Sequence, residues 1–576
     1  MANKKAVLTK PTPNASLPRN AFDRESMRTY HYALGQLIPA WYEPVTAGTH
    51  MKLNRKIFQR TGDLNTAAFP IMDTHIQYYF VPTRLMWSLW DNFRLGITDI
   101  ESTGQINIAN DMTLLGITTM PNRVPYSDLA DMYSQLSAWS SATPPATDVH
   151  GDIIEDSGMK LLNMLGYGNP RNWAPTVSGE VNLWPLLAYH KIYYDHFRNT
   201  QYENNNPRMY NMDYLWAQNR SMKLPSTELA GLLTLHYVNY RNDYFNNIYP
   251  SLNYIQTTSP SGGSGSLAPG TNVFNPIGLP NDVVGAYSGI NLFQHGIVKD
   301  IFGVRLSQNA QDIAANTTNS VVSMQAIRAG FALDKLMRSS AYAPQHVKDQ
   351  YEARYGIKFK RNNNHSIYIG AFKNDIQIGE VTSTADTGST GLPLGAIGGK
   401  GVSFDDWSKT LEFTADEDGI VMAVQYTTIR SCYGSFGLDS FLRKALPEDY
   451  FVPEFQNLGL EPVYGEELSL SLGQTTILGY RPRNQRYKLG VDKSYGLFAD
   501  TNVDMSHFIN HTEVGRIPSV GVSGVGYNWF KVNPHDLDGI VSVDYDGTWA
   551  TDQFFGQTIF GATMIQNMSV HGQPSL

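Results

Sequence analysis

The segment from Gly395 to Gly401 is the part of this sequence that comes nearest to a catalytic motif, because it resembles a phosphate-binding loop. It reads Gly-Ala-Ile-Gly-Gly-Lys-Gly. A phosphate-binding loop cradles phosphates with backbone N–H groups, and it needs a glycine six residues before its lysine and a hydroxyl residue directly after it. Here Leu394 occupies the first of these positions and Gly401 the second. The segment therefore predicts a glycine-rich turn and no nucleotide site.

Acidic and metal-binding side chains show no catalytic spacing either. Asp416, Glu417 and Asp418 precede Gly419 without the alternation or the distal glutamate of a calcium loop, so they predict a hairpin turn. The 14 histidines form no His-Glu-x-x-His pair, and no Gly-x-Ser-x-Gly elbow occurs. We predict no catalytic residue, no metal and no cofactor, although the paired carboxylates of a glycoside hydrolase need no fixed spacing and stay open.

The single cysteine, Cys432, cannot form a disulfide or a thiolate metal cluster within one chain. We expect it to be a small buried strand residue. A chain with a single cysteine is compatible with assembly in a reducing cytosol.

Lysine and arginine gather at two places where they could contact nucleic-acid phosphates. The whole chain has a net charge of −8, yet residues 1–60 carry ten Lys/Arg against three Asp/Glu. The first group of candidate genome-contacting residues is Lys4, Lys5, Lys10 and Arg19, and the second is Arg481, Arg483, Arg486 and Lys488. Cations interleaved with amide and aromatic side chains suit phosphate contact and base stacking. The alternatives are an arm that clamps a neighbouring subunit for the first group and a solvated loop for the second.

Aromatic residues are abundant, with 33 Tyr and 10 Trp, whereas charged residues make up only 17% of the chain. Such rings could stack on sugars, which would indicate a β-sandwich carbohydrate-binding or carbohydrate-active protein. Aromatic residues are also enriched where subunits bury one another. We favour burial in the core or at interfaces.

The periodic segments predict a mainly β protein. We expect strands within 75–82, 365–378, 411–433 and 536–548, where β-branched and aromatic residues alternate or run together. The first half of 420–429 is apolar on both faces and the second half alternates, as in a strand that runs out of a sandwich core. Helices are expected at 186–198, 324–336 and 344–356, the last ended by Gly356.

The organisation of the chain predicts an arm followed by one elaborated domain. We place a basic N-terminal arm and extended segment at 1–60 and one β domain at 61–576. The regions 100–160 and 200–320 are too long for ordinary connections and are expected to be elaborated loops. No apolar run is long enough to cross a membrane, so a membrane span is not expected.

The order of several short blocks resembles the major capsid proteins of microviruses, small tailless bacteriophages with circular single-stranded DNA, and in particular the gokushovirus-like branches of gut bacteria. No single block is specific, but their collinear order over almost the whole chain is. The blocks are Phe22-Asp-Arg24, Gly35-Gln-Leu-Ile-Pro39, Tyr79-Phe-Val-Pro-Thr-Arg-Leu-Met-Trp87 with Trp90 and Phe93, Pro185-Leu-Leu-Ala-Tyr189, Tyr194-Asp-His-Phe-Arg198, Arg241-Asn-Asp-Tyr-Phe245, Ile327-Arg-Ala-Gly-Phe331, Tyr355-Gly356, Leu478-Gly-Tyr-Arg481 and Tyr487-Lys488. The 100–160 segment is longer than the family pattern leads us to expect, and the C-terminal nine residues look more like the gut-phage branches than the chlamydia-phage type.

The resemblance implies a single eight-stranded antiparallel jelly-roll sandwich with very long inter-strand loops and a few short helices. It implies a structural protein, not an enzyme, that assembles with copies of itself into a T=1 icosahedral shell around single-stranded DNA. The implied partners are a small internal DNA-binding protein, a pilot protein and a host-cell surface receptor. The implied location is the virion, assembled in the cytoplasm of the host bacterium.

Residues 256–320 are expected to form a protrusion on the outer surface. A Gly/Ser/Pro tract is followed there by a weakly charged stretch, and exposed loops commonly carry recognition. In similar proteins an insertion at this place rises at the threefold axes. The residues expected outermost are Ser261, Gly262, Gly263, Ser264, Gly265 and Ser266, and those expected to pack copies together at the base are Phe274, Tyr287, Leu292 and Phe293. The alternative is an internal loop folded along the shell.

Overall fold

The computed structural model describes the β domain, its helices and a small lobe. The described residues are 19–64, 69–88, 124–142, 147–170, 179–218, 231–250, 364–382, 397–405, 409–455, 460–473, 476–499, 527–537, 540–542 and 552–568. Residues 90, 94, 349, 351, 352, 355, 356 and 570 are described as well. The protrusion at 256–320, the helix expected at 324–336 and the arm before residue 19 lie outside them. Within the described residues, Gly356 adopts a φ of 65° and its N–H bonds to the carbonyl of Glu352, so it ends a helical turn as predicted.

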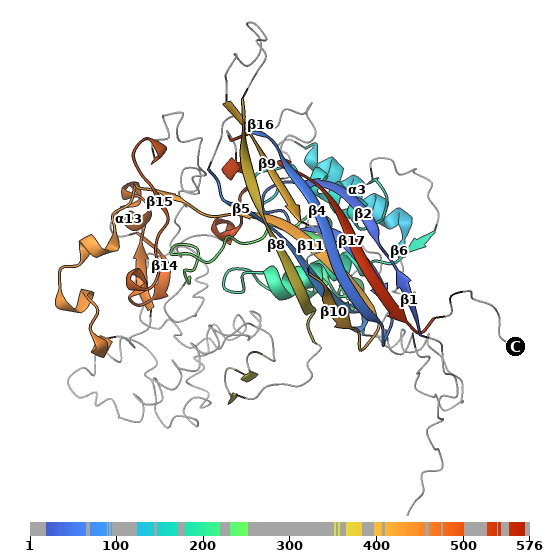
Figure 1. Cartoon of the computed structure of the whole chain (residues 1–576). Coiled ribbons are helices and arrows are strands. Elements are labelled where there is room, and N and C mark those ends of the chain that lie inside the picture. Colours follow the sequence, from blue (N-terminus) through green and yellow to red (C-terminus); the bar gives the residue numbers. More distant parts are fainter. Residues whose placement is uncertain are drawn as a thin grey trace, which may run out of the picture.

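The domain is built on a β-sandwich whose two layers share one long strand, β8 (Figure 1). In the first layer the strand order is β3-β11-β5-β8, and in the second it is β8-β9-β4-β17, with β1 and β2 following one another along the far edge of β17. The first part of β8 pairs with β5 and its last part with β9, always antiparallel. The strands are β1 (Asn20–Asp23), β2 (Ser26–Tyr32), β3 (Ile38–Val45), β4 (His50–Leu64), β5 (Met72–Pro82), β8 (Ile367–Thr382), β9 (Ile397–Asp405), β10 (Leu411–Thr414), β11 (Gly419–Ile429), β16 (Val541–Ser542) and β17 (Phe554–Gln566).

Aromatic side chains fill the space between the two layers. The ring of Trp41 on β3 stacks on Phe560 of β17 with centroids 5.9 Å apart, and it meets Tyr78 of β5 edge-on at 6.2 Å. Phe80 contacts Phe413 in the same interior at 5.2 Å. Side chains alternate between the faces of a strand, so every second residue of β5 and β11 points into this core.

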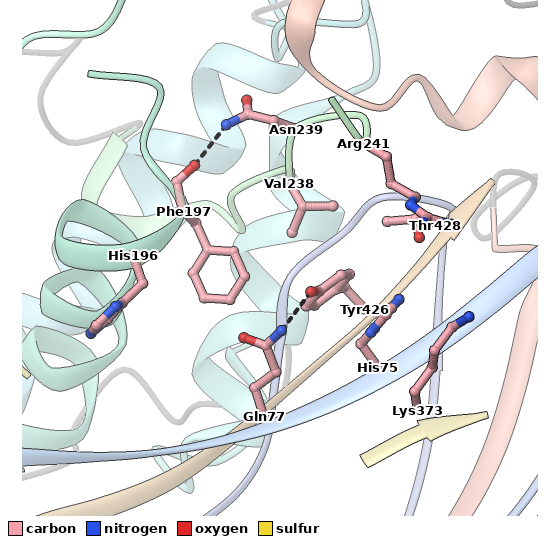
Figure 2. Close-up of a pocket in the computed structure, with 10 residues that line it drawn as sticks. All are labelled: His75, Gln77, His196, Phe197, Val238, Asn239, Arg241, Lys373, Tyr426 and Thr428. Carbon is pink, nitrogen blue, oxygen red and sulfur yellow. Dashed lines mark hydrogen bonds between the residues drawn. The ribbon is translucent and has the colours of Figure 1, made fainter. Parts of the chain in front are cut away.

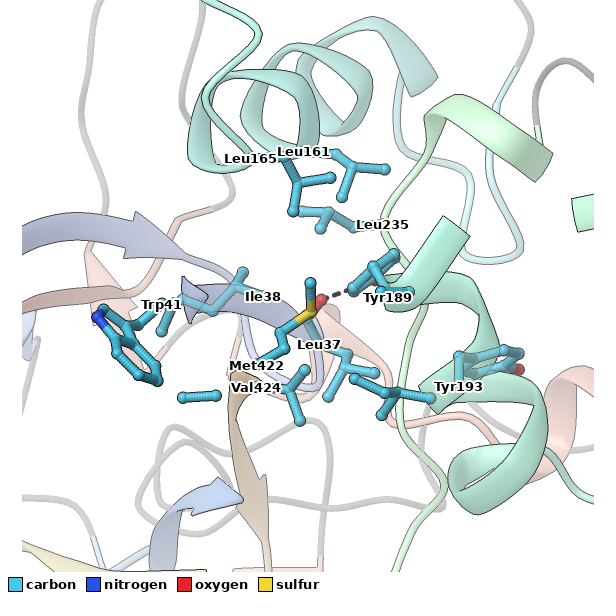
Figure 3. Packing of buried hydrophobic residues seen from close by; sticks show 14 of the residues in the cluster. Leu37, Ile38, Trp41, Leu161, Leu165, Tyr189, Tyr193, Leu235, Met422 and Val424 are labelled. Carbon is cyan, nitrogen blue, oxygen red and sulfur yellow. Dashed lines mark hydrogen bonds between the residues drawn. The ribbon is translucent and has the colours of Figure 1, made fainter. Parts of the chain in front are cut away.

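Helices cover the outer face of the first layer. They are α3 (Tyr126–Ser140), α4 (Ile154–Met164), α5 (Trp184–Ile192) continued by the π-helical turn η3 (Tyr193–Phe197), and α6 (Met212–Gln218), with the short elements η1 (Thr83–Leu85), β6 (Val124–Pro125), β7 (Glu180–Val181) and η4 (Pro207–Met209). Every residue of α5 from Pro185 to Ile192 is buried. Figure 3 shows Met422 and Val424 of β11 beneath Leu161, Leu165 and Tyr189. The Tyr189 hydroxyl donates to the Leu37 carbonyl at 2.8 Å and joins the helices to the sheet.

A small lobe with its own hydrophobic core stands beside the sandwich (Figure 1). Its elements are β12 (Tyr433–Gly434), η7 (Ser440–Arg443), η8 (Pro447–Asp449), η9 (Pro453–Phe455), β13 (Leu460–Tyr464), α13 (Gly465–Leu468), η10 (Leu470–Leu472), β14 (Ile477–Pro482), η11 (Gln485–Tyr487), β15 (Lys493–Ser494), η12 (Gly496–Ala499) and η14 (Tyr527–Phe530), with η15 (Pro534–Leu537) returning the chain to the sandwich. Its core residues are Tyr244, Phe245, Ile248, Tyr433, Val463, Leu468, Leu478, Trp529 and Phe530.

The main sequence predictions of fold are confirmed. The chain is mainly β and consistent with a jelly-roll sandwich, while the number of eight strands stays a prediction. The strands expected at 75–82 and 365–378 are β5 and β8, and the helix expected at 186–198 is α5 with η3. The long 100–160 region contains α3 and part of α4, so the helices are more extensive than expected.

The predicted arm boundary at residue 60 is wrong, because residues 20–64 form four strands of the sandwich. The basic residues from Arg24 to Arg60 therefore belong to the folded domain. Only the residues before 19 remain candidates for a separate arm.

The acidic turn at 416–419 is not a hairpin turn. β10 pairs with β4 and β11 pairs with β3 and β5, so the turn carries the chain from one layer to the other. Glu417 pairs with Arg84 at 2.6 Å, and Asp418 accepts from the Ala47 N–H at 2.8 Å. Gly419 is required by close approach, since a Cβ there would lie 2.5 Å from the Val81 carbonyl oxygen.

Four further local predictions need correction. The segment 397–401 is the start of β9, not a turn, because its backbone pairs with β8 and β4. Cys432 lies between β11 and β12 and is partly buried. Pro534–Leu537 is a 3₁₀ turn, so only Val541–Ser542 of the expected 536–548 strand is seen among the described residues. The second half of β11 does not leave the core, since Gln425 and Thr427 are fully buried.

A pair of buried histidines lies under the helices. His190 Nε2 donates to the Leu232 carbonyl at 2.7 Å, which leaves Nδ1 to accept from His236 Nε2 at 2.8 Å. His236 stacks on Tyr193 at 3.6 Å, and the ammonium group of Lys531 binds the Tyr193 hydroxyl at 2.6 Å. Burial lowers the pKa of His190 to about 4, the pKa of His236 well below its usual range and the pKa of Lys531 to about 7.

This pair predicts a loss of stability on acidification. Between pH 6.5 and about 4 the unfolded chain protonates both imidazoles while the folded chain does not. The free energy of unfolding therefore falls by about 1.4 kcal/mol for each histidine with every unit by which the pH is lowered. Lys531, whose pKa in the folded protein is about 7, adds a smaller loss of the same sign between pH 7 and about pH 6 and none below that, where it is charged in both states. Thermal unfolding at pH 7 and pH 5 measures the effect. His236→Phe keeps the stack on Tyr193 and should roughly halve the slope, whereas an unchanged melting temperature in the parent protein would contradict the assignment.

Candidate assembly and genome-binding surfaces

The centre of the small lobe is an ion cluster around Arg481 on β14. Its Nε donates to Glu461 at 3.0 Å and its Nη1 to Glu467 at 2.9 Å, and the guanidinium lies 4.2 Å from the ring centre of Tyr244. The arginine is only 3% exposed. Arg481 therefore holds β13, α13 and β14 together, and its assignment as a genome-contacting residue is wrong.

Two of the other basic residues predicted for this segment are also bonded within the lobe. Arg486 binds Asp439 through Nη2 at 2.8 Å, and this pairing lowers the pKa of Asp439 to about 2. Lys488 is exposed and donates to the Arg483 carbonyl at 3.0 Å, while Arg483 is half-buried. Arg19 is exposed and reaches the Gly48 carbonyl at 3.3 Å. Lys488, Arg483 and Arg19 keep a candidate role in DNA contact, and Lys4, Lys5 and Lys10 lie outside the described residues.

The outside of the lobe carries many large apolar side chains, which we call the lobe surface. Leu442 is 68% exposed and Tyr495 is 67% exposed. The members are Phe436, Phe441, Leu442, Leu446, Tyr450, Phe451, Leu470, Tyr487, Leu489, Tyr495 and Leu497. Several of them adjoin, because Phe441 meets Tyr450 edge-on at 6.1 Å and the Lys444 ammonium lies over the rings of both Tyr450 and Tyr487. Soluble monomers rarely leave large apolar patches in water, so this surface indicates a protein interface.

A pocket of about 390 Å³ lies between the outer face of the first layer and the segments that follow α5 and α6 (Figure 2). β5 contributes His75 and Gln77, β11 contributes Tyr426 and Thr428, and β8 contributes Lys373. The remaining lining residues are His196, Phe197, Val238, Asn239 and Arg241. Lys373, His75 and Tyr426 are register partners across three adjacent strands, which is why they share one face.

Ring stacking and hydrogen bonds hold the pocket walls in place. His75 stacks on Tyr426 at 5.0 Å, and Phe197 meets Tyr426 edge-on at 5.6 Å. Gln77 donates to the Tyr426 hydroxyl at 2.7 Å, and Asn239 Nδ2 donates to the Phe197 carbonyl at 2.8 Å. Burial lowers the pKa of His75, so this imidazole is neutral at pH 7.

Sequence reasoning missed this pocket. Its residues come from segments more than 300 positions apart, and no spacing rule connects them. The available signals were two blocks, Tyr194 to Arg198 and Arg241 to Phe245, which entered only through the family resemblance. Within the second block Asp243 is structural, because it accepts from the N–H groups of Phe245 and Asn246 and from the Tyr433 hydroxyl.

Two features of the described residues bear on other functions. No group of His, Cys, Asp and Glu that could hold a metal ion occurs among them. In that part of the chain no helix is both long and apolar enough to span a membrane.

The structural role of Arg481 predicts a large local effect of its removal. Arg481→Ala leaves two carboxylates of the lobe without their cation. We therefore expect the free energy of unfolding to fall by about 3–5 kcal/mol, as for other broken buried ion pairs. Faster hydrogen exchange in peptides covering β13 and β14 is the readout. Lys488→Ala is the matched exposed control and should change stability by less than about 0.5 kcal/mol. Normal exchange in Arg481→Ala together with reduced DNA binding would restore the genome-contact assignment.

Comparison with known proteins shows the family of this chain. A family model described as capsid protein (F protein) matches residues 11–137 and 170–576. Capsid protein VP1 of Chlamydia phage 1 is 23% identical over 538 residues, covering 84% of this chain and 85% of that protein. Capsid protein VP1 of Bdellovibrio phage phiMH2K is 22% identical over 539 residues, covering 87% of each. These matches favour the capsid class over the carbohydrate-active alternative. The chain belongs to the capsid protein (F protein) family and is a microvirus major capsid protein, a component of the virion.

Proposed function

We propose that copies of this chain close into a T=1 icosahedral shell that encloses a circular single-stranded DNA genome and presents a host-facing surface. The lobe surface carries the proposal. Among the described residues of the small lobe, eleven large apolar side chains are exposed in the isolated subunit. Burying such side chains against a neighbouring copy gains about 25 cal/mol for each Å² of apolar area, and the gain repeats at every contact of a symmetric shell.

The remaining parts of the proposal follow from charge and position. The arm before residue 19, with Lys4, Lys5 and Lys10 and supported by Arg19, lies inside the shell and neutralises DNA phosphates, or clamps a neighbouring subunit. Residues 256–320 form the outer protrusion that meets a host-cell receptor. A small internal DNA-binding protein and a pilot protein complete the virion, which assembles in the bacterial cytoplasm. The chain itself performs no catalytic step.

An acidic residue on the lobe surface should block assembly without unfolding the subunit. In Leu442→Glu a charge replaces an exposed apolar side chain, so stability should change by less than about 0.5 kcal/mol while shells fail to close. Sedimentation and electron microscopy measure the shells, and thermal unfolding measures the subunit. Val381→Glu, at an exposed position of β8 outside the lobe, is the matched control. Full shell yield from Leu442→Glu would contradict burial of the lobe surface.

The arm can be tested by its charge. Changing Lys4, Lys5 and Lys10 together to glutamine removes three cations that would release counterions from DNA, so recovered particles should contain less genome. The ratio of absorbance at 260 and 280 nm measures the content. An unchanged ratio and unchanged salt sensitivity of the particles would leave the arm only the clamping role.

A further inference from the structure

The outer face of the second layer carries aromatic rings that reach solvent. Phe58 on β4 and Phe404 on β9 are register partners, and they are 48% and 61% exposed. Phe555 of β17, the strand on the other side of β4 (Figure 1), lies on the same face, because it is the register partner of Arg60. The inner face of this sheet already fills the sandwich core, and a solvated outer face is normally polar. Exposed phenylalanines on neighbouring strands therefore indicate a partner.

Cations stand between these rings. Burial alternates along β4, and five consecutive side chains that point outward are Lys52, Asn54, Lys56, Phe58 and Arg60. The Lys56 ammonium lies 5.8 Å from the ring centre of Phe404. The Arg60 guanidinium lies 5.9 Å from the ring centre of Phe555. The face therefore presents flat rings and positive charge to the same partner.

This face accounts for part of the basic bias at the start of the chain. Three of the ten basic residues among the first 60 project from it, namely Lys52, Lys56 and Arg60. Lys52 is balanced by Glu412 at 3.0 Å, whereas no carboxylate of the described residues forms an ion pair with Arg60. The charge that the sequence places near the N-terminus is thus partly displayed on a rigid strand, beside the aromatic rings.

The composition of the face suits single-stranded DNA better than a second copy of the chain. The core of a protein interface is depleted of charged residues, and of lysine in particular. Here Lys56 and Arg60 flank Phe58 on β4, a strand with β9 on one side and β17 on the other. Proteins that hold single strands combine basic side chains with aromatic rings on which bases stack, and they do so with little sequence preference. A β-sheet is a known platform for such rings.

We propose that the outer face of the second layer lines the inside of the shell and binds the enclosed single-stranded DNA. Bases stack on the exposed rings of Phe58 and Phe404, while the Lys56 ammonium and the Arg60 guanidinium contact the adjoining phosphates. The proposal rests on the proposed function, because enclosure of the genome is what brings DNA to this face. It adds base stacking on a rigid sheet to the charge neutralisation assigned to the arm.

The test separates stacking of bases from contact with phosphates. Purified full-length protein is titrated against a fluorescent (dC)6 oligonucleotide and against a hexamer of abasic sites, with binding read by anisotropy. Phe58→Thr combined with Phe404→Thr should bind (dC)6 about tenfold more weakly and the abasic hexamer unchanged, whereas tyrosine at both positions should bind like the parent. Lys56→Gln and Arg60→Gln should each weaken both complexes and lower the slope of log K against log salt by about 0.7. Tyr368→Thr, at a half-exposed aromatic position of β8 paired with β5 in the first layer, is the matched control and should change neither.

A second measurement places the bases in assembled particles. Ultraviolet cross-linking of genome-filled shells should join DNA to peptides containing Phe58 or Phe404. Unchanged (dC)6 binding by the double threonine variant, or filled shells without these cross-links, would overturn the proposal while leaving the capsid function intact. A double variant that binds DNA like the parent but forms no shells would assign the face to a contact between copies instead. Failure of the parent chain to form DNA-containing shells would refute the proposed function.

Discussion

A buried hydrogen-bond network between the two layers of the sandwich is the interaction on which the rest of the structure depends. The Tyr32 hydroxyl on β2 donates to Thr427 of β11 at 2.7 Å and accepts from Gln59 of β4 at 2.9 Å and from Gln425 at 3.1 Å. Thr74 of β5 joins through Thr427 at 2.9 Å. Tyr32, Gln59, Gln425 and Thr427 are fully buried. Polar groups in a dry interior must be paired, so the two layers can meet in only one register.

The register of β11 has consequences on its other face. With Gln425 and Thr427 pointing into the sandwich, Met422 and Val424 pack under the helices, and Tyr426 and Thr428 line the pocket. A slip by one residue would exchange these two sets and leave the polar side chains against apolar helices. One strand thus fixes the core, the helical cover and one wall of the pocket together. In the small lobe the buried Arg481 cluster has the same organising role, and the apolar residues that it leaves outside are free to meet another copy.

The sequence predicted what depends on local pattern and failed where distant segments meet. The alternation in 75–82 and the spacing in 186–198 correctly indicated β5 and α5, because periodicity reports which face is buried. It could not show that the turn at 416–419 changes layers, since a hairpin and a crossover need the same turn residues. Arg481 was taken for a DNA contact because its neighbours Arg483, Arg486 and Lys488 are basic, whereas its partners Glu461 and Glu467 are brought to it only by the fold. Most of the pocket residues carried no local signal, because they come from separate strands and loops that only the fold brings together.

An electron cryo-microscopy reconstruction of particles assembled from this chain tests the central claim most directly. The claim is that the subunit is complete only in a closed shell, where its apolar lobe surface is covered by a neighbouring copy. The account predicts a T=1 shell in which Phe441, Leu442 and Tyr495 lie in an interface between copies. A soluble monomer, or a shell in which these side chains face solvent, would contradict it.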